Sequence, residues 1–230
     1  MENTKNIHEG HRKRLKERFL KGGMDSLSDI NCLELVLFYA LPRRDTNPIA
    51  HALLEHFGSL SAVLDASPEQ LQQIPGISEH AATLLHAIPQ LARRYMVDQT
   101  NTDDILNTTR RCGEYLMPHF VGAREEQVYL LCLDAKCKAL DCRMVAKGSL
   151  NTANVPIRKI VEVALAVNAT SVVLAHNHPS GIALPSREDE ATTLRLYAAL
   201  EAMGILLADH IIIADDDFVS MADSRFSIFR

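Results

Sequence analysis

The stretch SVVLAHNHPSG, residues 171–181, is typical of a short buried β-strand that ends in two histidines and a loop-forming segment. Side chains at alternating positions of a strand point to the same face, so His176 and His178 can converge on one ion. Proline cannot continue the hydrogen-bond ladder, and Pro179-Ser180-Gly181 therefore ends the strand directly after the second histidine. This pattern predicts two imidazoles that face the same way at the C-terminal end of a strand.

The loop after this strand leads to a helix that we predict over residues 188–203, with Gly204 as its C-terminal stop. Ser186 is a natural N-cap for that helix. Asp189 falls in the first turn, where its carboxylate can face back toward the end of the strand. A third oxygen or nitrogen ligand is therefore expected close to the two histidines.

Two neutral nitrogens and one carboxylate leave the fourth tetrahedral position of a zinc ion for water, as in catalytic rather than structural zinc sites. Such an ion lowers the pKa of the water toward ~7 and supplies a hydroxide nucleophile. A His-x-His pair alone is a weak signal, but the Pro-Ser-Gly break and the Ser-x-x-Asp helix start add specificity. The sequence predicts a divalent metal site, with Zn²⁺ favoured, at His176, His178 and Asp189.

The composition is that of a soluble globular protein with one large domain or two modest ones. The 230 residues are 47% apolar and 23% charged, and no apolar run approaches the roughly 20 residues of a membrane-spanning helix. The first six residues are polar and lack the apolar core of a signal peptide. Five cysteines without a CxxC pair fit reduced thiols. We expect a cytoplasmic protein without a membrane partner.

The net charge of −5 argues against a protein that coats nucleic acid by charge alone. Residues 1–24 nevertheless carry seven lysines and arginines against three glutamates, a local excess of four positive charges. A basic helix of this kind is either a solvated helix face or a surface that contacts phosphates or an acidic partner protein.

Two domains of different class are predicted along the chain. Residues 1–98 read as an all-helical domain, with apolar helical spacing over 33–41 and 49–57, a helix start at Ser67-Pro68 and a further helix over 90–95. The polar residues from 97 to 104 indicate a linker, which we set at 99–107. The second domain, 108–230, mixes strands and helices and is predicted to be α/β (α+β). Its predicted strands are 128–133, a second strand through Val145, 171–175, 211–213 and 218–220, and its helices are 160–168 and 188–203.

The motif from His176 to Gly181, followed by Pro185-Ser186-x-x-Asp189, resembles the JAMM signature of JAB/MPN metallopeptidases. With asparagine between the histidines, it is similar to the RadC family of bacterial proteins, which are described as DNA repair proteins. Further matches are Phe57-Gly58, Gly148-Ser149-Leu150-Asn151 and Asp209-His210-Ile211-Ile212-Ile213. The resemblance implies a helical domain followed by a JAB/MPN domain with a cytidine-deaminase-like mixed sheet. It also implies a zinc-dependent metalloprotease that hydrolyses an amide or isopeptide bond in a peptide or protein substrate.

The resemblance also assigns roles to single residues. His176, His178 and Asp189 match the zinc ligands, and Ser186 matches the serine that helps to stabilise the oxyanion on the scissile carbonyl. Glu126 matches the general base, and a carboxylate at a strand edge near a metal can move a proton from water to the leaving amine. Glu125 is the competing base, and a pair of solvated acids is the alternative to both.

Asp209-His210 is a second polar pair within an apolar stretch. His210 could orient a metal ligand through its second ring nitrogen, or Asp209 could bond to a ligand histidine. A purely structural pair is the third alternative, and neither residue is assigned to the site.

Residues 71–78, LQQIPGIS, resemble the helix-hairpin-helix motif, whose turn presents backbone N–H groups to a DNA phosphate. The usual second glycine is Ser78 here, and Glu79-His80 follows where a basic residue is expected. The motif therefore predicts either a DNA contact or a purely structural hairpin. Two functions follow for the whole chain: a metallopeptidase, or a DNA- or protein-binding factor in DNA repair whose metal domain is not catalytic.

Overall fold

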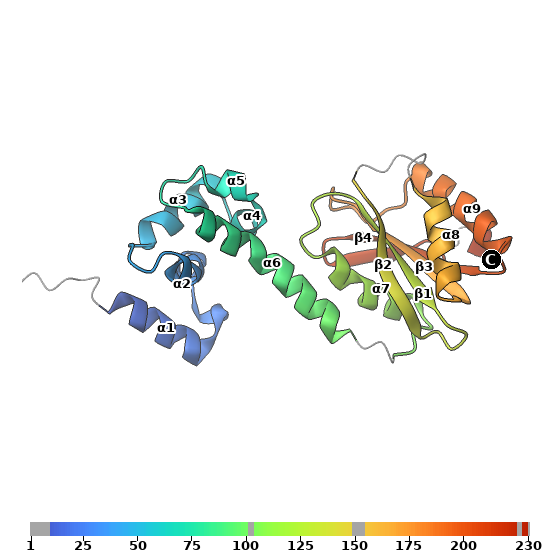
Figure 1. Cartoon of the computed structure of the whole chain (residues 1–230), viewed down its shortest axis with the longest axis horizontal. Helices are drawn as coiled ribbons and strands as arrows, with labels where there is room; N and C mark the ends of the chain where they lie inside the picture. Colours follow the sequence, from blue (N-terminus) through green and yellow to red (C-terminus); the bar gives the residue numbers. More distant parts are fainter. Residues whose placement is uncertain (1–9, 101–103, 149–154, 225–226, 230) are drawn as a thin grey trace, which may run out of the picture. The chain divides into compact units, whose positions relative to one another are not determined.

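The computed structural model describes residues 10–100, 104–148, 155–224 and 227–229 (Figure 1). The chain divides into two compact units, Met1–Leu91 and Ala92–Arg230. This boundary lies inside a helix, whereas the first domain was predicted to end at residue 98.

None of the helices in the described part of the chain combines the length and apolar composition needed to span a membrane. The Gly148–Asn151 match falls mostly outside the described residues.

The first unit consists of helices, as predicted. They are α1 (His11–Gly22), η1 (Met24–Ser26), α2 (Asp29–Ala40), α3 (Asn47–Phe57), α4 (Leu60–Asp65), α5 (Pro68–Leu71) and the first part of α6 (Glu79–Gln99). Gly58 ends α3 in the left-handed conformation (φ 86°), and Ser67 caps α5 with proline at its start. The core of the unit is formed by apolar side chains of α2 to α6, among them Leu33, Leu37, Leu53, Leu71 and Leu85.

The helix α6 differs from the prediction. It is continuous from Glu79 to Gln99, so residues 90–95 are helical as predicted but belong to a longer helix. Residues 97–99 form the last turn of this helix and are not part of a linker. Pro89 lies inside the helix, where a missing N–H normally breaks the pattern. Good helix formers such as Leu91 and Ala92 follow it, and polar residues are compatible with an exposed helix end.

The second unit is built on one mixed sheet, which confirms the α+β prediction. Its strands are β1 (Gln127–Leu133), β2 (Ala139–Lys147), β3 (Ser171–Asn177), β4 (Leu206–Ala214) and β5 (Asp217–Ser220), in the order β2-β1-β3-β4-β5. Only β3 and β4 pair in parallel; the other neighbours are antiparallel. The remaining elements are α7 (Thr109–Leu116), η2 (Met117–Phe120), α8 (Ile157–Ala166), α9 (Arg187–Glu201) and η3 (Ser227–Phe229).

Helices cover both faces of this sheet (Figure 1). On one face, Leu130 and Leu174 pack with side chains of α8 and α9. On the other, Leu131 and Val173 pack with side chains of α7. All residues of β1 and β3 are buried, which is why both read as continuous apolar runs rather than as alternating patterns. His176 follows Leu174 by two positions and therefore lies on the face covered by α8 and α9.

The helix α7 was not predicted from the sequence. Its start is nevertheless encoded locally, because Thr108 accepts a hydrogen bond from the backbone N–H of Arg111. Gly113 in the middle weakens the helical signal, but it permits close packing. A Cβ atom at this position would overlap the ring of Phe218 on β5.

Gly113→Ala tests this packing. Alanine improves helix propensity by up to about 1 kcal/mol, but forcing a methyl group into the Phe218 ring costs about 1–3 kcal/mol. We expect the free energy of unfolding, measured in urea, to fall by about 1–2 kcal/mol. The same substitution in a Phe218→Leu background should cost less, because the smaller side chain leaves room. A Gly113→Ala protein more stable than the wild type would contradict the close contact.

Candidate metal centre

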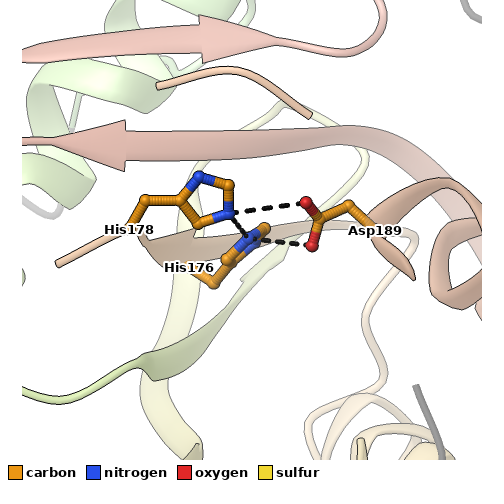
Figure 2. Close-up of side chains that lie close together, drawn as sticks. All are labelled: His176, His178 and Asp189. Carbon is orange, nitrogen blue, oxygen red and sulfur yellow. Dashed lines mark hydrogen bonds and ion pairs between the residues drawn. The ribbon is translucent and has the colours of Figure 1, made fainter. Parts of the chain in front are cut away.

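Three side chains from two elements converge at the C-terminal end of β3 (Figure 2). His176 is the penultimate residue of the strand, and His178 follows its end; their Nε2 atoms lie 2.9 Å apart. Asp189, in the first turn of α9, places Oδ1 3.0 Å from Nε2 of His176 and Oδ2 3.4 Å from Nε2 of His178. These residues, the His-His-Asp group, are the ones predicted from the sequence as metal ligands.

Local backbone structure accounts for this convergence. The N–H of His178 donates to the carbonyl of Ile213 on β4 (2.8 Å), so the second histidine is still held beside the sheet. The chain then turns at Gly181, which has φ 78°. Ser186 caps α9 in a reciprocal arrangement with Asp189: its Oγ accepts the Asp189 N–H (3.1 Å), and its own N–H donates to Oδ2 (2.7 Å).

The ring of His178 is oriented for binding a cation. Its Nδ1 lies 2.9 Å from the carbonyl oxygen of Ile182. A carbonyl oxygen only accepts, so Nδ1 carries a hydrogen and Nε2, which faces Asp189, is the nitrogen that can bind an ion. The carboxylate of Asp189 is ionised: burial opposes its charge, but His176 and the hydrogen bonds from Ser186 hold its pKa well below the usual range.

The spacing of the donor atoms fits a small divalent ion. Zinc bonds of about 2.0–2.1 Å in a tetrahedron place neighbouring ligand atoms roughly 3.3 Å apart. The three observed separations are 2.9, 3.0 and 3.4 Å. Two imidazole nitrogens and one carboxylate oxygen are also a donor set that zinc prefers. The His-His-Asp group can therefore hold a metal ion and leave one coordination position open.

A cavity of about 350 Å³ opens onto this group. Its volume is in the range of small-ligand sites. Apolar side chains of Val128, Val155 and Leu174 form part of its wall, and further lining residues are Glu126, Ser186, Glu188, Thr192 and His210.

Comparison with protein families assigns both parts of the chain. A family model described as RadC-like JAB domain matches residues 106–226, more than half of the chain, and a second, UPF0758 N-terminal, matches residues 5–83. The chain belongs to the RadC family. The resemblance inferred from the sequence motifs is thereby confirmed, and the RadC-like JAB domain contains the whole His-His-Asp group.

Within this RadC domain, the structure separates the two candidate bases. Glu126 lines the cavity. Glu125 is exposed and forms an ion pair with Lys147 (3.8 Å). The backbone on both sides of Glu126 is held by Asn177: its side chain accepts the N–H of Gln127 (2.7 Å) and donates to the carbonyl of Glu125 (3.2 Å). The asparagine between the two histidines thus ties the start of β1 to β3, a role that no local sequence pattern predicts.

The pair Asp209-His210 has two separate roles. His210 lies beside the centre, with Nε2 2.9 Å from Nδ1 of His176. Burial holds the pKa of His210 well below its usual value. Asp209 instead accepts hydrogen bonds from Ser220 (2.7 Å) and Thr109 (3.3 Å), which join β5 and α7 to β4. The first alternative raised for His210 agrees with the structure, whereas a bond from Asp209 to a ligand histidine does not.

Ser186→Ala tests whether the helix cap positions the carboxylate. Loss of the capping hydroxyl costs about 1 kcal/mol of stability, and Asp189 loses a partner, so divalent metal affinity should fall by about 10-fold. Ser67→Ala, which disrupts the equivalent capping box of α5, is the matched control. Its stability should fall similarly while metal affinity is unchanged. Urea unfolding and competition with a chelator measure the two effects; equal metal affinity in both variants would contradict the positioning role.

Proposed function

We propose that this protein is a zinc-dependent JAMM-type metallopeptidase that hydrolyses an amide or isopeptide bond. The observation that supports it best is the convergence of the His-His-Asp group on one point of a cavity that Glu126 also lines. Donor atoms with an open coordination position and a carboxylate nearby are the components of hydrolytic zinc sites. Membership of the RadC family is consistent with this chemistry.

Each residue of the site has its own role in the proposed reaction. Nε2 of His176, Nε2 of His178 and Oδ1 of Asp189 would hold the ion. When bound, zinc supplies a Lewis acid that makes water nucleophilic near neutral pH. Glu126 accepts a proton from the attacking water and delivers it to the leaving amine.

Ser186 has the second proposed catalytic role. Its hydroxyl lies 2.6 Å from Oδ2 of Asp189 and also lines the cavity. Rotation of this O–H toward a bound carbonyl oxygen would stabilise the negative charge that develops there. The serine therefore serves as helix cap in the resting protein and as oxyanion donor during turnover.

The substrate is proposed to be a peptide or protein segment, and the compartment the cytoplasm. The apolar wall of Val128, Val155 and Leu174 can accept an apolar side chain next to the bond that is cleaved. All five cysteines are free thiols, which agrees with the reducing compartment expected from the sequence.

Glu126→Gln tests the proposed reaction. The amide keeps the shape of the side chain but cannot accept a proton from water, so zinc content should stay near one equivalent while cleavage falls by about 100-fold or more. The zinc-loaded protein is incubated with a library of proteome-derived peptides, and new N-termini are identified by labelling and mass spectrometry.

Glu125→Gln is the matched control for this experiment, because its carboxylate pairs with Lys147 at the surface. It should cleave like the wild type. If Glu126→Gln cleaves peptides as fast as the wild type, Glu126 is not the general base. A zinc-loaded wild type that cleaves no peptide would contradict the peptidase proposal.

We also propose a second function, contact of the helical unit with DNA, which one observation favours. The turn between α5 and α6 contains Gly76 with φ 98°, and Ser78 caps α6 by accepting the N–H of Ala81 (3.3 Å). The exposed Arg44 donates from Nη1 to the carbonyl of Gly76 (3.2 Å). A cation that was expected in the sequence after the turn is thus supplied by the loop between α2 and α3.

Arg44→Ala tests this contact. Loss of one phosphate-neutralising charge should weaken duplex binding regardless of sequence and reduce the slope of log affinity against log salt by about 1. Gel shifts over a salt series measure both. The control is Arg110→Ala in the second unit, where the exposed Arg110 forms an ion pair with Glu114. This variant should bind DNA as the wild type does. Absence of wild-type binding at low salt, or an unchanged slope for Arg44→Ala, would contradict the DNA role.

A further inference from the structure

A chain of buried hydrogen bonds leads from the helix α9 to the candidate metal centre. Thr193 Oγ1 lies 2.6 Å from the carbonyl oxygen of Asp189 and 2.6 Å from Nδ1 of His210. Nε2 of His210 lies 2.9 Å from Nδ1 of His176. The exposed fractions are 0% for Thr193, 1% for His210 and 5% for His176, so these partners are not exchanged for water.

The hydrogen of the Thr193 hydroxyl can be assigned from its neighbours. The carbonyl oxygen of Asp189 only accepts, and two oxygens 2.6 Å apart without a hydrogen between them would repel each other. The hydroxyl therefore donates to Asp189. A thioether sulfur, that of Met221, lies 3.5 Å away, but it is a weak acceptor and the hydroxyl has only one hydrogen.

The remaining hydrogens follow from this assignment. Because its own hydrogen is used, Thr193 Oγ1 can only accept from His210, so Nδ1 of His210 carries a hydrogen. The neutral ring then has a lone pair on Nε2, which accepts from Nδ1–H of His176. When an ion occupies the site, His176 can then offer it the lone pair on Nε2, the atom that faces His178 and Asp189.

We propose that Thr193 is a positioning residue for the metal centre, and that it acts through His210 to fix His176 in the tautomer whose Nε2 is free to bind the ion. This inference rests on the metal centre of the proposed function. His178 achieves the same tautomer with a backbone carbonyl, that of Ile182, whereas His176 requires two side chains.

The position of Thr193 also couples the two kinds of ligand. Asp189 and Thr193 are four residues apart on one face of α9, so one helical turn carries a metal ligand and the residue that sets the tautomer of another. His210 lies on β4 and His176 on β3, so the relay joins three elements. A substitution at Thr193 should therefore change the protonation of Nε2 of His176 without removing any of the three proposed ligands.

Thr193→Val removes the hydroxyl and keeps the volume of the side chain. We expect zinc affinity of the full chain, measured by competition with a chromogenic chelator, to fall by about 10- to 100-fold. Thr193→Ser keeps the hydroxyl and should bind within about 3-fold of the wild type. Thr46→Val is the matched control in the other unit: Thr46 is also buried (1%), and its hydroxyl has no hydrogen-bond partner in the described structure.

A second measurement reads the tautomer directly. The ¹⁵N chemical shifts of labelled histidines in the zinc-free protein, recorded over a pH series, distinguish hydrogen on Nδ1 from hydrogen on Nε2. We expect His176 to carry its hydrogen on Nδ1 in the wild type and to populate both tautomers in Thr193→Val. This readout does not depend on zinc or on turnover.

The outcomes separate the two proposals. A wild type that binds no zinc contradicts the proposed function, and the spectra still test the relay. A neutral His176 with its hydrogen on Nε2 in the wild type overturns the relay, even if Thr193→Val fails to fold. Wild-type zinc affinity together with an unchanged tautomer in a folded Thr193→Val protein also overturns it.

Discussion

The parallel pairing of β3 with β4 determines the geometry of the candidate metal centre. In this pairing Leu174 lies opposite His210, and His176 lies opposite Ile212. Parallel neighbours need a crossover, and the chain between them forms α9 on one face of the sheet. The start of that crossover must lie near the end of β3, where the two histidines are. Asp189 reaches the histidines because it occupies the first turn of this helix, and Thr193 reaches His210 because it occupies the next.

The same constraint explains which parts of the structure could be predicted from the sequence. His176, His178, Ser186 and Asp189 obey local rules, namely alternation along a strand and the capping of a helix, and these rules act within a few residues. The strands β1 and β3 are long apolar runs with clear ends. In these cases the short-range pattern and the final structure have the same cause.

Residues whose roles depend on distant partners could not be found in this way. Asn177 contacts the backbone of residues 125–127, about fifty positions earlier, and no local pattern distinguishes it from a solvated asparagine. Glu126 was selected by family resemblance, and only the packing of β1 beside β3 separates it from Glu125. The helix α7 was missed because Gly113 weakens its signal, and the reason for the glycine lies on β5.

Energetic considerations suggest why a histidine and a threonine are buried beside an otherwise apolar sheet. A buried polar pair contributes little to stability, because its hydrogen bonds replace bonds to water, and an apolar pair of the same shape would be about as stable. His210 precedes three consecutive isoleucines on β4, all fully or almost fully buried. An aliphatic side chain at position 210 would therefore give the fold about the same stability. What an aliphatic side chain cannot do is accept a hydrogen bond from Nδ1 of His176, and in the proposed relay that acceptor keeps the ring nitrogen facing Asp189 available for a cation.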